Sequence, residues 1–203
     1  VANLDSDDVW LPGHISVTRS ALRDSDLVFT SALKFGSRLL GTRLTRVAPL
    51  TPTESSLALL IHNPFFHSSM LARRSALEHA GSYADQRRGQ DYDLWLRAAA
   101  GGSRIRRLPV ATVAYRISET QISHSDGYLK RIAADENVAT NYLAMFDGLQ
   151  RKWDDGQTDS HRFLRGIPAR MSGLNRAYYE KVVRANPVPV YFRDNGETVW
   201  RGY

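Results

Sequence analysis

The 203-residue sequence contains no cysteine, which excludes disulfide bonds, thiolate metal sites and cysteine nucleophiles. It has no apolar run near the ~18 residues needed to cross a bilayer, and the densest apolar run is Leu57 to Ile61. Neither a phosphate-binding Gly-x-x-x-x-Gly-Lys loop nor a Gly-x-Ser-x-Gly elbow occurs, so P-loop hydrolysis and esterase chemistry have no support. The chain begins with Val1 and shows no basic-then-apolar leader, so we expect no signal peptide and a fragment of a longer protein.

The composition is that of an ordinary folded protein. Hydrophobic residues make up 42% of the chain and charged residues 24%, which excludes a collagen, a coiled coil or a wholly disordered chain. Lysine and arginine number 27 against 21 acidic residues, for a net charge of +6. This surplus favours anionic partners such as nucleotide phosphates, nucleic acid or an acidic leaflet. Aromatic residues are not interleaved with the basic pairs as a base-stacking platform requires, so no nucleic-acid partner is expected.

Local patterns predict a mixture of strands and helices. Apolar runs bounded by turn residues indicate strands, and apolar residues at helical spacing followed by glycine indicate helices. We expect a buried strand ending in an acidic turn at 1–8, strands at 27–30, 65–71, 105–110 and 112–117, and helices at 15–22, 75–80, 91–100, 128–149 and 177–185. A hairpin at 191–200 is expected because Asn195-Gly196 suits a type I′ turn. Ser75 and Glu78 fit a capping box, and the Pro-, Ser- and Thr-rich stretch 36–56 is expected to be a loop.

Two acidic clusters can carry chemistry. Asp5-Ser6-Asp7 forms a D-x-D pattern at an expected strand end, and such carboxylates suit Mg²⁺ or Mn²⁺ with phosphate oxygens completing the shell. Alternatively, these residues form only an Asx turn or a helix cap. Asp91 lies in the first turn of an expected helix, where the macrodipole stabilises its anion and leaves it able to accept a proton. The competing interpretation makes Asp91 a cap, Leu94 and Trp95 core residues, and Asp93 with Arg97 a surface pair of little energetic worth.

The order and spacing of several segments together closely resemble the second half of the family 2 glycosyltransferases. The segments are 4–12 (LDSDDVWLP), 68–78 (SSMLARRSALE), 81–85, 90–97 (QDYDLWLR) and Tyr115-Arg116 before Ile122-Ser123. The resemblance implies an α/β, partial GT-A fold, a nucleotide-diphospho-sugar transferase-like mixed sheet flanked by helices. It covers 1–125, and we expect 126–203 to be a helical extension with a terminal β-hairpin.

The same resemblance implies an inverting, metal-assisted transfer of a sugar from a nucleotide-sugar donor to an acceptor hydroxyl. It makes Asp91 the catalytic base, and places Asp5, Asp7 and Arg116 at the donor, with Asp7 on the Mn²⁺ or Mg²⁺. It also places Gln90 and Trp95 on the acceptor side.

The resemblance also implies a glycan or lipid-linked acceptor of the cell envelope. It implies a cytoplasmic location, with peripheral association at the inner face of the cell membrane as a further expectation. The fragment is expected to be inactive alone, because the family's nucleotide-base-binding half precedes Asp5.

Two positions depart from the family pattern. Gln90 stands where the family usually has an acid, and Ser118 where it often has a histidine, for which His124 is a candidate substitute. His62 and His67 are five residues apart, which neither one helix face nor one strand face brings together, so no histidine metal site is expected. Two alternatives stay open: a non-catalytic or degenerate transferase-like binding module, and a basic protein that binds nucleic acid or a membrane surface.

Overall fold

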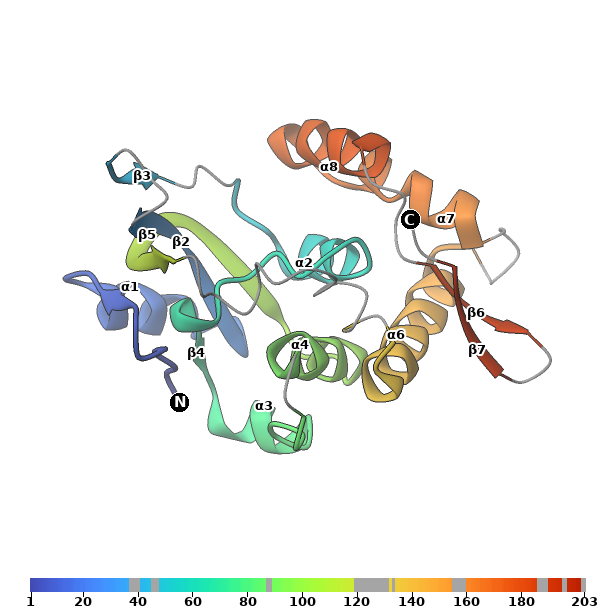
Figure 1. Cartoon of the computed structure of the whole chain (residues 1–203), viewed down its shortest axis with the longest axis horizontal. Coiled ribbons are helices and arrows are strands. Elements are labelled where there is room, and N and C mark those ends of the chain that lie inside the picture. Colours follow the sequence, from blue (N-terminus) through green and yellow to red (C-terminus); the bar gives the residue numbers. More distant parts are fainter. Residues whose placement is uncertain are drawn as a thin grey trace.

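The computed structural model describes residues 1–36, 41–44, 48–86, 89–118, 132, 134–154, 160–185, 190–194 and 197–201. Its elements follow one another as a small mixed sheet, helices inserted between its strands, and a helical C-terminal part with a hairpin (Figure 1). The elements are β1 (Val9–Trp10), α1 (His14–Ala21), β2 (Leu27–Gly36), β3 (Arg43–Leu44), α2 (Pro52–Leu59), η1 (His67–Ser69), β4 (Leu71–Ala72), α3 (Arg74–His79), α4 (Gln90–Ala100), β5 (Ile105–Ile117), α6 (Glu136–Asp154), α7 (Ser160–Gly166), η3 (Pro168–Arg170), α8 (Gly173–Ala185), β6 (Val190–Asp194) and β7 (Glu197–Arg201).

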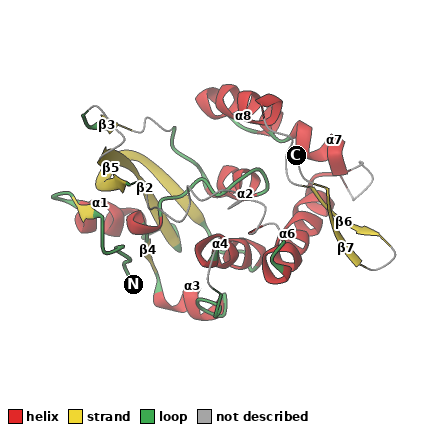
Figure 2. Cartoon of the chain, in the orientation of Figure 1, coloured by secondary structure: helices red, strands yellow, loops and turns green. Residues whose placement is uncertain are grey.

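The main sheet is mixed, with the order β1-β5-β2-β3 and with β4 also paired to β2. The two long strands, β2 and β5, are parallel, and the other pairings are antiparallel. Along β2 the side chains alternate between the two faces of the sheet. Leu27 and Phe29 join the main hydrophobic core, whereas the Thr30 hydroxyl contacts that of Thr112 at 2.7 Å on the face where His14 of α1 lies. The expected mixed α/β sheet flanked by helices is confirmed (Figure 2).

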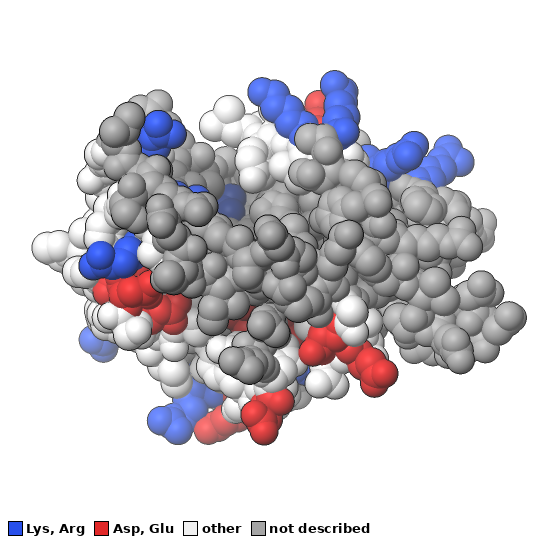
Figure 3. All heavy atoms as spheres, viewed as in Figure 1, with Lys and Arg blue, Asp and Glu red and all other residues white. Residues whose placement is uncertain are grey.

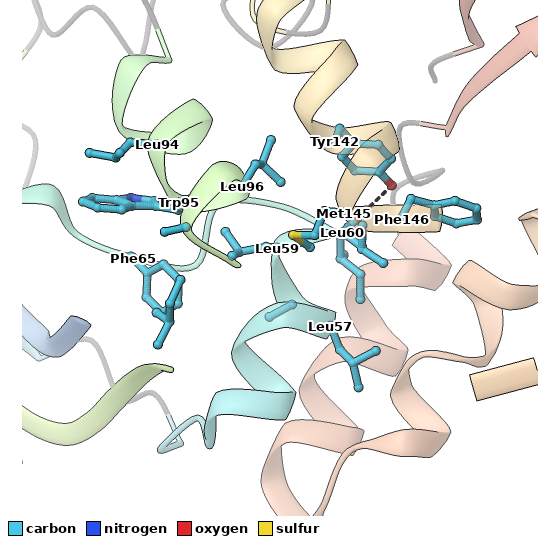
Figure 4. Packing of buried hydrophobic residues seen from close by; sticks show 14 of the residues in the cluster. Leu57, Leu59, Leu60, Phe65, Leu94, Trp95, Leu96, Tyr142, Met145 and Phe146 are labelled. Atoms are coloured by element: carbon cyan, nitrogen blue, oxygen red, sulfur yellow. Dashed lines mark hydrogen bonds between the residues drawn. The ribbon is translucent and has the colours of Figure 1, made fainter. Parts of the chain in front are cut away.

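The core continues without interruption from the sheet into the C-terminal helices. Trp95 of α4 packs edge-on against Phe29, and Tyr142 of α6 donates its hydroxyl to the Leu60 carbonyl at 2.8 Å (Figure 4). Fully buried Phe163 and Tyr179 bring α7 and α8 into the same cluster. Helices α6, α7 and α8 therefore share one hydrophobic core with the sheet, although the expected boundary at 125/126 lies outside the described residues.

Several predicted elements are confirmed and others are corrected. Helices α1, α4 and α8 and the antiparallel pair β6 and β7 are present, while the Asn195-Gly196 turn lies outside the described residues. The buried strand at 1–4 is wrong, because Ala2 makes a single bridge to Leu71 and Val1 and Leu4 are exposed. The predicted strand at 65–71 is instead η1 followed by the two residues of β4.

Three further corrections concern local signals. Helix α2 begins inside the expected loop and continues to Leu59, with a capping box between Thr51 and Glu54 and Pro52 in its first turn. The capping box predicted at Ser75 is absent, since α3 begins after Arg73 without a side-chain cap, although Gly81 follows it with φ +79° as expected. The two predicted strands at 105–117 form one strand, β5, whose register against β2 shifts near Pro109.

The longest predicted helix also needs a new boundary. Helix α6 runs over Glu136–Asp154, later than the predicted 128–149, and residues 119–131 lie outside the described ranges. Among the described residues, no helix is long and apolar enough to span a membrane.

Candidate functional site

The acidic stretch at 5–8 forms a turn just before β1. The Asp8 amide donates to the Asp5 carbonyl at 3.1 Å, which closes the turn. Asp8 itself is buried and accepts hydrogen bonds from the Ser68 hydroxyl at 2.6 Å and the Arg116 amide at 2.8 Å. Burial raises the pKa of Asp8 although these two hydrogen bonds oppose the rise. Asp8 therefore anchors the turn to η1 and to the end of β5.

The side chain of Arg116 also hydrogen-bonds to this turn. Its Nε donates to the Asp7 carbonyl at 3.1 Å, and its guanidinium lies over the ring of Phe35 at 4.9 Å. The expected donor-side arginine is thus beside the D-x-D turn, and it contacts a backbone carbonyl of that turn. The end of β5 and the acidic turn are consequently held as one unit.

The turn suits a divalent metal only in part. Asp7 is exposed, whereas Asp5 is half-buried and hydrogen-bonded to neighbouring side chains. Over the residues that the structure describes, no group of three or more His, Asp or Glu side chains could hold a metal by itself. An exposed single carboxylate fits a Mg²⁺ or Mn²⁺ whose remaining ligands come from water and phosphate oxygens. Asp7 would be its protein ligand.

Asp91 lies at the start of α4, as predicted. Gly89 precedes the helix with φ +67°, and a β-carbon there would approach Ile132 to 3.2 Å, so this position favours glycine. One oxygen of Asp91, Oδ2, accepts a hydrogen bond from the Asn63 side-chain amide at 2.8 Å. That bond holds the carboxylate in one orientation.

His67 in η1 contacts Asp5 of the acidic turn and Tyr83 of the loop before α4. Its Nδ1 lies 3.1 Å from Asp5 Oδ1 and 3.0 Å from the Asn3 side-chain nitrogen, and its Nε2 lies 2.8 Å from the Tyr83 hydroxyl. The Tyr83 ring also packs edge-on against the imidazole. Residues from the N-terminal turn, η1 and the loop before α4 therefore meet around one histidine.

The charges of both Asp5 and Asp91 act on His67. Burial alone lowers the pKa of His67, but the Asp5 hydrogen bond and the charges of Asp5, Asp91 and Asp8 outweigh it and raise the pKa. The hydrogen bond from His67 in turn lowers the pKa of Asp5. Burial, with the charges of Asp91 and Asp5, raises the pKa of Tyr83 to about 12. Carboxylates 86 positions apart in the sequence thus act on the same two side chains.

Sequence reasoning missed the residues that connect these carboxylates. Asn3 and Asn63 lie in no motif, Tyr83 lies in the segment 81–85 but has no role assigned to it, and the sequence offers His67 only as a metal ligand. The available signal was position, since Asn3 and His67 directly precede two of the segments that carry the resemblance. Their partners come from distant parts of the chain, so the sequence could not pair them.

The interpretation of Asp93 and Arg97 as a weak surface pair is wrong. Asp93 is fully buried, with one oxygen 2.7 Å from Arg97 Nη2 and the other accepting from the Asn141 side chain of α6 at 2.7 Å. Arg97 also donates to the carbonyls of Ala80 and Ser82. Asp93 therefore connects α4 to α6 through Asn141, and Arg97 connects α4 to the loop after α3. The two hydrogen-bonded partners of Asp93 offset the cost of burying its charge.

The two acceptor-side residues fare differently. Trp95 is fully buried among core side chains, so the structure corrects its assignment: the indole cannot contact an acceptor from this position. The centroid of its ring lies 6.2 Å from that of the His67 ring. Gln90 is exposed at the first position of α4, next to Asp91. Ser118 is half-buried after β5, and His124 lies outside the described residues.

Comparison with known proteins finds a sequence relative and several similar solved structures. No family model matches the chain. The chain is 26% identical, over 129 residues, to the amylovoran biosynthesis glycosyltransferase AmsE of Erwinia amylovora. These residues are 63% of this chain and 48% of AmsE, so the chain spans about half the length of the curated relative that it matches. A crystal structure of S. aureus TarS 1–349 in complex with UDP-GlcNAc aligns with a TM-score of 0.47 at 12% identity, covering 100% of this chain and 72% of that chain.

Proposed function

We propose that this chain is part of a GT-A, family 2-like glycosyltransferase that moves a hexose from a nucleotide-sugar donor to an acceptor hydroxyl with inversion. The observation that carries the proposal is that Asp5 contacts His67 at 3.1 Å and that the charges of Asp5 and Asp91 both raise the pKa of this histidine. These are the two positions at which the sequence resemblance assigns donor binding and catalysis. The similarity to a glycosyltransferase over 129 residues supports the same reaction class.

In this reaction Asp91 is the general base. Its carboxylate takes the proton from the acceptor hydroxyl as that oxygen bonds to the anomeric carbon of the donor sugar. The bond from the anomeric carbon to the diphosphate oxygen breaks on the opposite face, which inverts the configuration and releases the nucleoside diphosphate. The hydrogen bond from Asn63 at 2.8 Å orients the carboxylate, and exposed Gln90 is assigned to acceptor binding.

On the donor side, we assign Asp5 to the ribose or sugar, Asp7 to the metal and Arg116 to the diphosphate. When bound, Mg²⁺ or Mn²⁺ supplies positive charge that stabilises the departing diphosphate. Asp5 is positioned for hydrogen bonding to hydroxyl groups, since His67 and Asn3 orient its Oδ1. The acceptor is proposed to be a glycan or a lipid-linked glycan of the cell envelope, used on the cytoplasmic side.

The test is transfer activity of the full-length protein with a panel of nucleotide sugars, measured as release of nucleoside diphosphate. Asp91→Asn keeps the shape of the side chain and removes proton acceptance, so turnover should fall at least ~100-fold while donor affinity changes little. Asp147→Asn, on the exposed surface of α6, is the matched control and should retain turnover.

Two results would contradict the proposal. If Asp91→Asn retains wild-type turnover, Asp91 is not the base. If the wild-type protein binds donors in a metal-dependent way but never releases nucleoside diphosphate, the chain is a transferase-like binding module.

A further inference from the structure

The positive charge of this protein is concentrated in its last helices. Residues 160–185, which form α7, η3 and α8, contain six arginine or lysine residues and a single acid, Glu180, for a net charge of +5. The other 177 residues contain 21 basic and 20 acidic residues, so they contribute only +1 of the total of +6. The basic residues of the segment are Arg162, Arg165, Arg170, Arg176, Lys181 and Arg184. Lysine and arginine side chains gather over α8 and along α7 at the upper edge of the molecule (Figure 3).

The outer face of α8 also carries two large exposed apolar residues. Leu174 is 77% exposed and Tyr178, four positions later, is 49% exposed. At about 100° per residue, Leu174, Tyr178 and Lys181 lie within a sector of about 60° on the helix surface, with Arg184 beside them. Single exposed apolar residues are ordinary, but here two of them lie together inside the most basic part of the chain.

The opposite face of α8 is firmly docked, so the exposed face has a defined orientation. Asn175 donates its side-chain amide to the Pro49 carbonyl at 2.7 Å. Tyr179 is fully buried and stacks on the imidazole of His62 with the ring centroids 5.6 Å apart. Val182 is partly buried against the core. One face of α8 therefore packs against the body of the protein, and the opposite face presents apolar and basic side chains to solvent.

We propose that the face formed by α7, η3 and α8, called here the basic helical face, binds the surface of an anionic lipid bilayer. Leu174 and Tyr178 enter the interfacial region, and Lys181 and Arg184 contact the headgroups. Helices that combine apolar residues with flanking cations bind membranes in this way, through buried apolar area and attraction to anionic lipid. The proposal stands independently of glycosyl transfer, because none of these residues belongs to the site around Asp91.

The composition of the face favours a bilayer over the two other occupants. A single-stranded nucleic acid needs a series of stacking aromatic rings among the cations, whereas this face offers Tyr178 beside a leucine at 77% exposure that contributes nothing to phosphate binding. A second copy of the chain would place five net positive charges against five, which repel unless anions intervene. An anionic bilayer satisfies both the charge and the apolar residues.

The experiment is co-sedimentation of the 203-residue chain with vesicles of phosphatidylcholine, alone or with 30 mol% phosphatidylglycerol. Binding is expected to the anionic vesicles and not to pure phosphatidylcholine, and it should weaken as salt rises. Each cation removed near a membrane surface should weaken binding about fivefold, so Lys181→Gln with Arg184→Gln should weaken it about 25-fold. Leu174→Asp should weaken binding to a similar degree, and Leu174→Gln should do so with less perturbation of the fold.

Matched controls lie on α1 and just after it, and Figure 1 shows α1 at the left of the molecule, apart from α7 and α8. Ile15 is 42% exposed, and Arg19 and Arg23 are exposed nearby. Ile15→Asp, and Arg19→Gln with Arg23→Gln, should leave vesicle binding unchanged. Circular dichroism melts verify that every variant is folded.

The proposal is overturned if the wild-type chain does not sediment with anionic vesicles. It is equally overturned if the α8 variants bind as well as the α1 variants. A chain that dimerises, and becomes monomeric in Leu174→Asp without any vesicle binding, would make the face a self-association surface. Salt-sensitive binding to single-stranded RNA that exceeds vesicle binding would assign it to nucleic acid.

Discussion

The buried carboxylate of Glu54 allows a stability change to be worked out from the structure. Glu54 lies in the first turn of α2 with only 5% of its surface exposed. It accepts hydrogen bonds from the amide and hydroxyl of Thr51 at 3.1 and 2.9 Å, and from the amide and hydroxyl of Ser172 at 3.0 and 2.8 Å. The Asn175 side chain lies 3.3 Å away. This one carboxylate therefore joins α2 to the start of α8.

The size of the effect follows from the pKa of this carboxyl group. Burial alone raises the pKa of Glu54, but the Ser172 and Thr51 donors outweigh it and lower the pKa from 4.5 to about 2. At about 1.4 kcal/mol per pKa unit, this difference corresponds to roughly 3 kcal/mol of folding free energy. Because the folded pKa is depressed, the contribution is present above pH 4.5 and is lost as the pH falls toward 2.

Glu54→Gln tests this estimate, since the glutamine keeps the size of the side chain but turns a donor toward groups that are themselves donors. Urea unfolding at pH 7 should show a loss of about 3 kcal/mol, and the difference from wild type should shrink as the pH falls below 4.5. Glu78→Gln is the control, because Glu78 is exposed and makes only a 4.0 Å pair with Arg74. It should change stability by less than about 0.5 kcal/mol.

Two results would refute the reasoning about Glu54. A loss below about 1 kcal/mol at pH 7 would mean that the hydrogen bonds do not compensate burial as argued. A difference that does not shrink with falling pH would mean that the charge of the carboxylate is irrelevant to stability.

The remaining predictions concern the site and its support. Asp93→Asn should destabilise the protein by about 3 kcal/mol in urea unfolding, because it removes the charge of the fully buried carboxylate that pairs with half-buried Arg97, and a loss below about 0.5 kcal/mol would contradict this. Asp7→Asn should weaken Mn²⁺ binding in the presence of UDP or GDP in the full-length protein, as measured by titration calorimetry, and unchanged affinity would remove Asp7 from the metal site. An NMR titration should give His67 a pKa above 6.5, and this pKa should fall in Asp5→Asn. Because the folded pKa is raised, the contribution of the His67–Asp5 contact to stability is present below pH 6.5 and is lost as the pH rises through the folded pKa. An unchanged His67 pKa in Asp5→Asn would show that the contact is not electrostatic.

Local sequence determined the elements whose signals are carried by neighbouring residues. The periodicity of α4 and α8 and the antiparallel strands of the hairpin need only short-range spacing, and the structure has all of them. Helix α2 belongs in the same class, because Thr51, Pro52 and Glu54 form a recognisable start signal that the Ser- and Thr-rich composition of the stretch obscured. The strand expected at 65–71 failed because a short apolar run has no conformation of its own until its neighbours pair with it.

In the candidate site, too, sequence identified some residues and only the tertiary structure identified the others. Motif order alone marked Asp5, Asp7 and Asp91, because a resemblance in sequence reports residue types and spacing. Only the tertiary structure brought His67 and Asn63 to those carboxylates, since both lie on an irregular segment whose course depends on the sheet beneath it.

Tertiary packing also reversed the expected roles of the neighbouring residues of α4. Asp93 is one helical turn from Arg97 in any amphipathic helix, but α6 covers it and supplies Asn141 as a partner. Trp95 has the character of an acceptor-binding aromatic in the sequence, yet the sheet closes over it and makes it core. Sequence determines which side chains a helix offers, and the elements that pack against it decide which of them reach solvent and substrate.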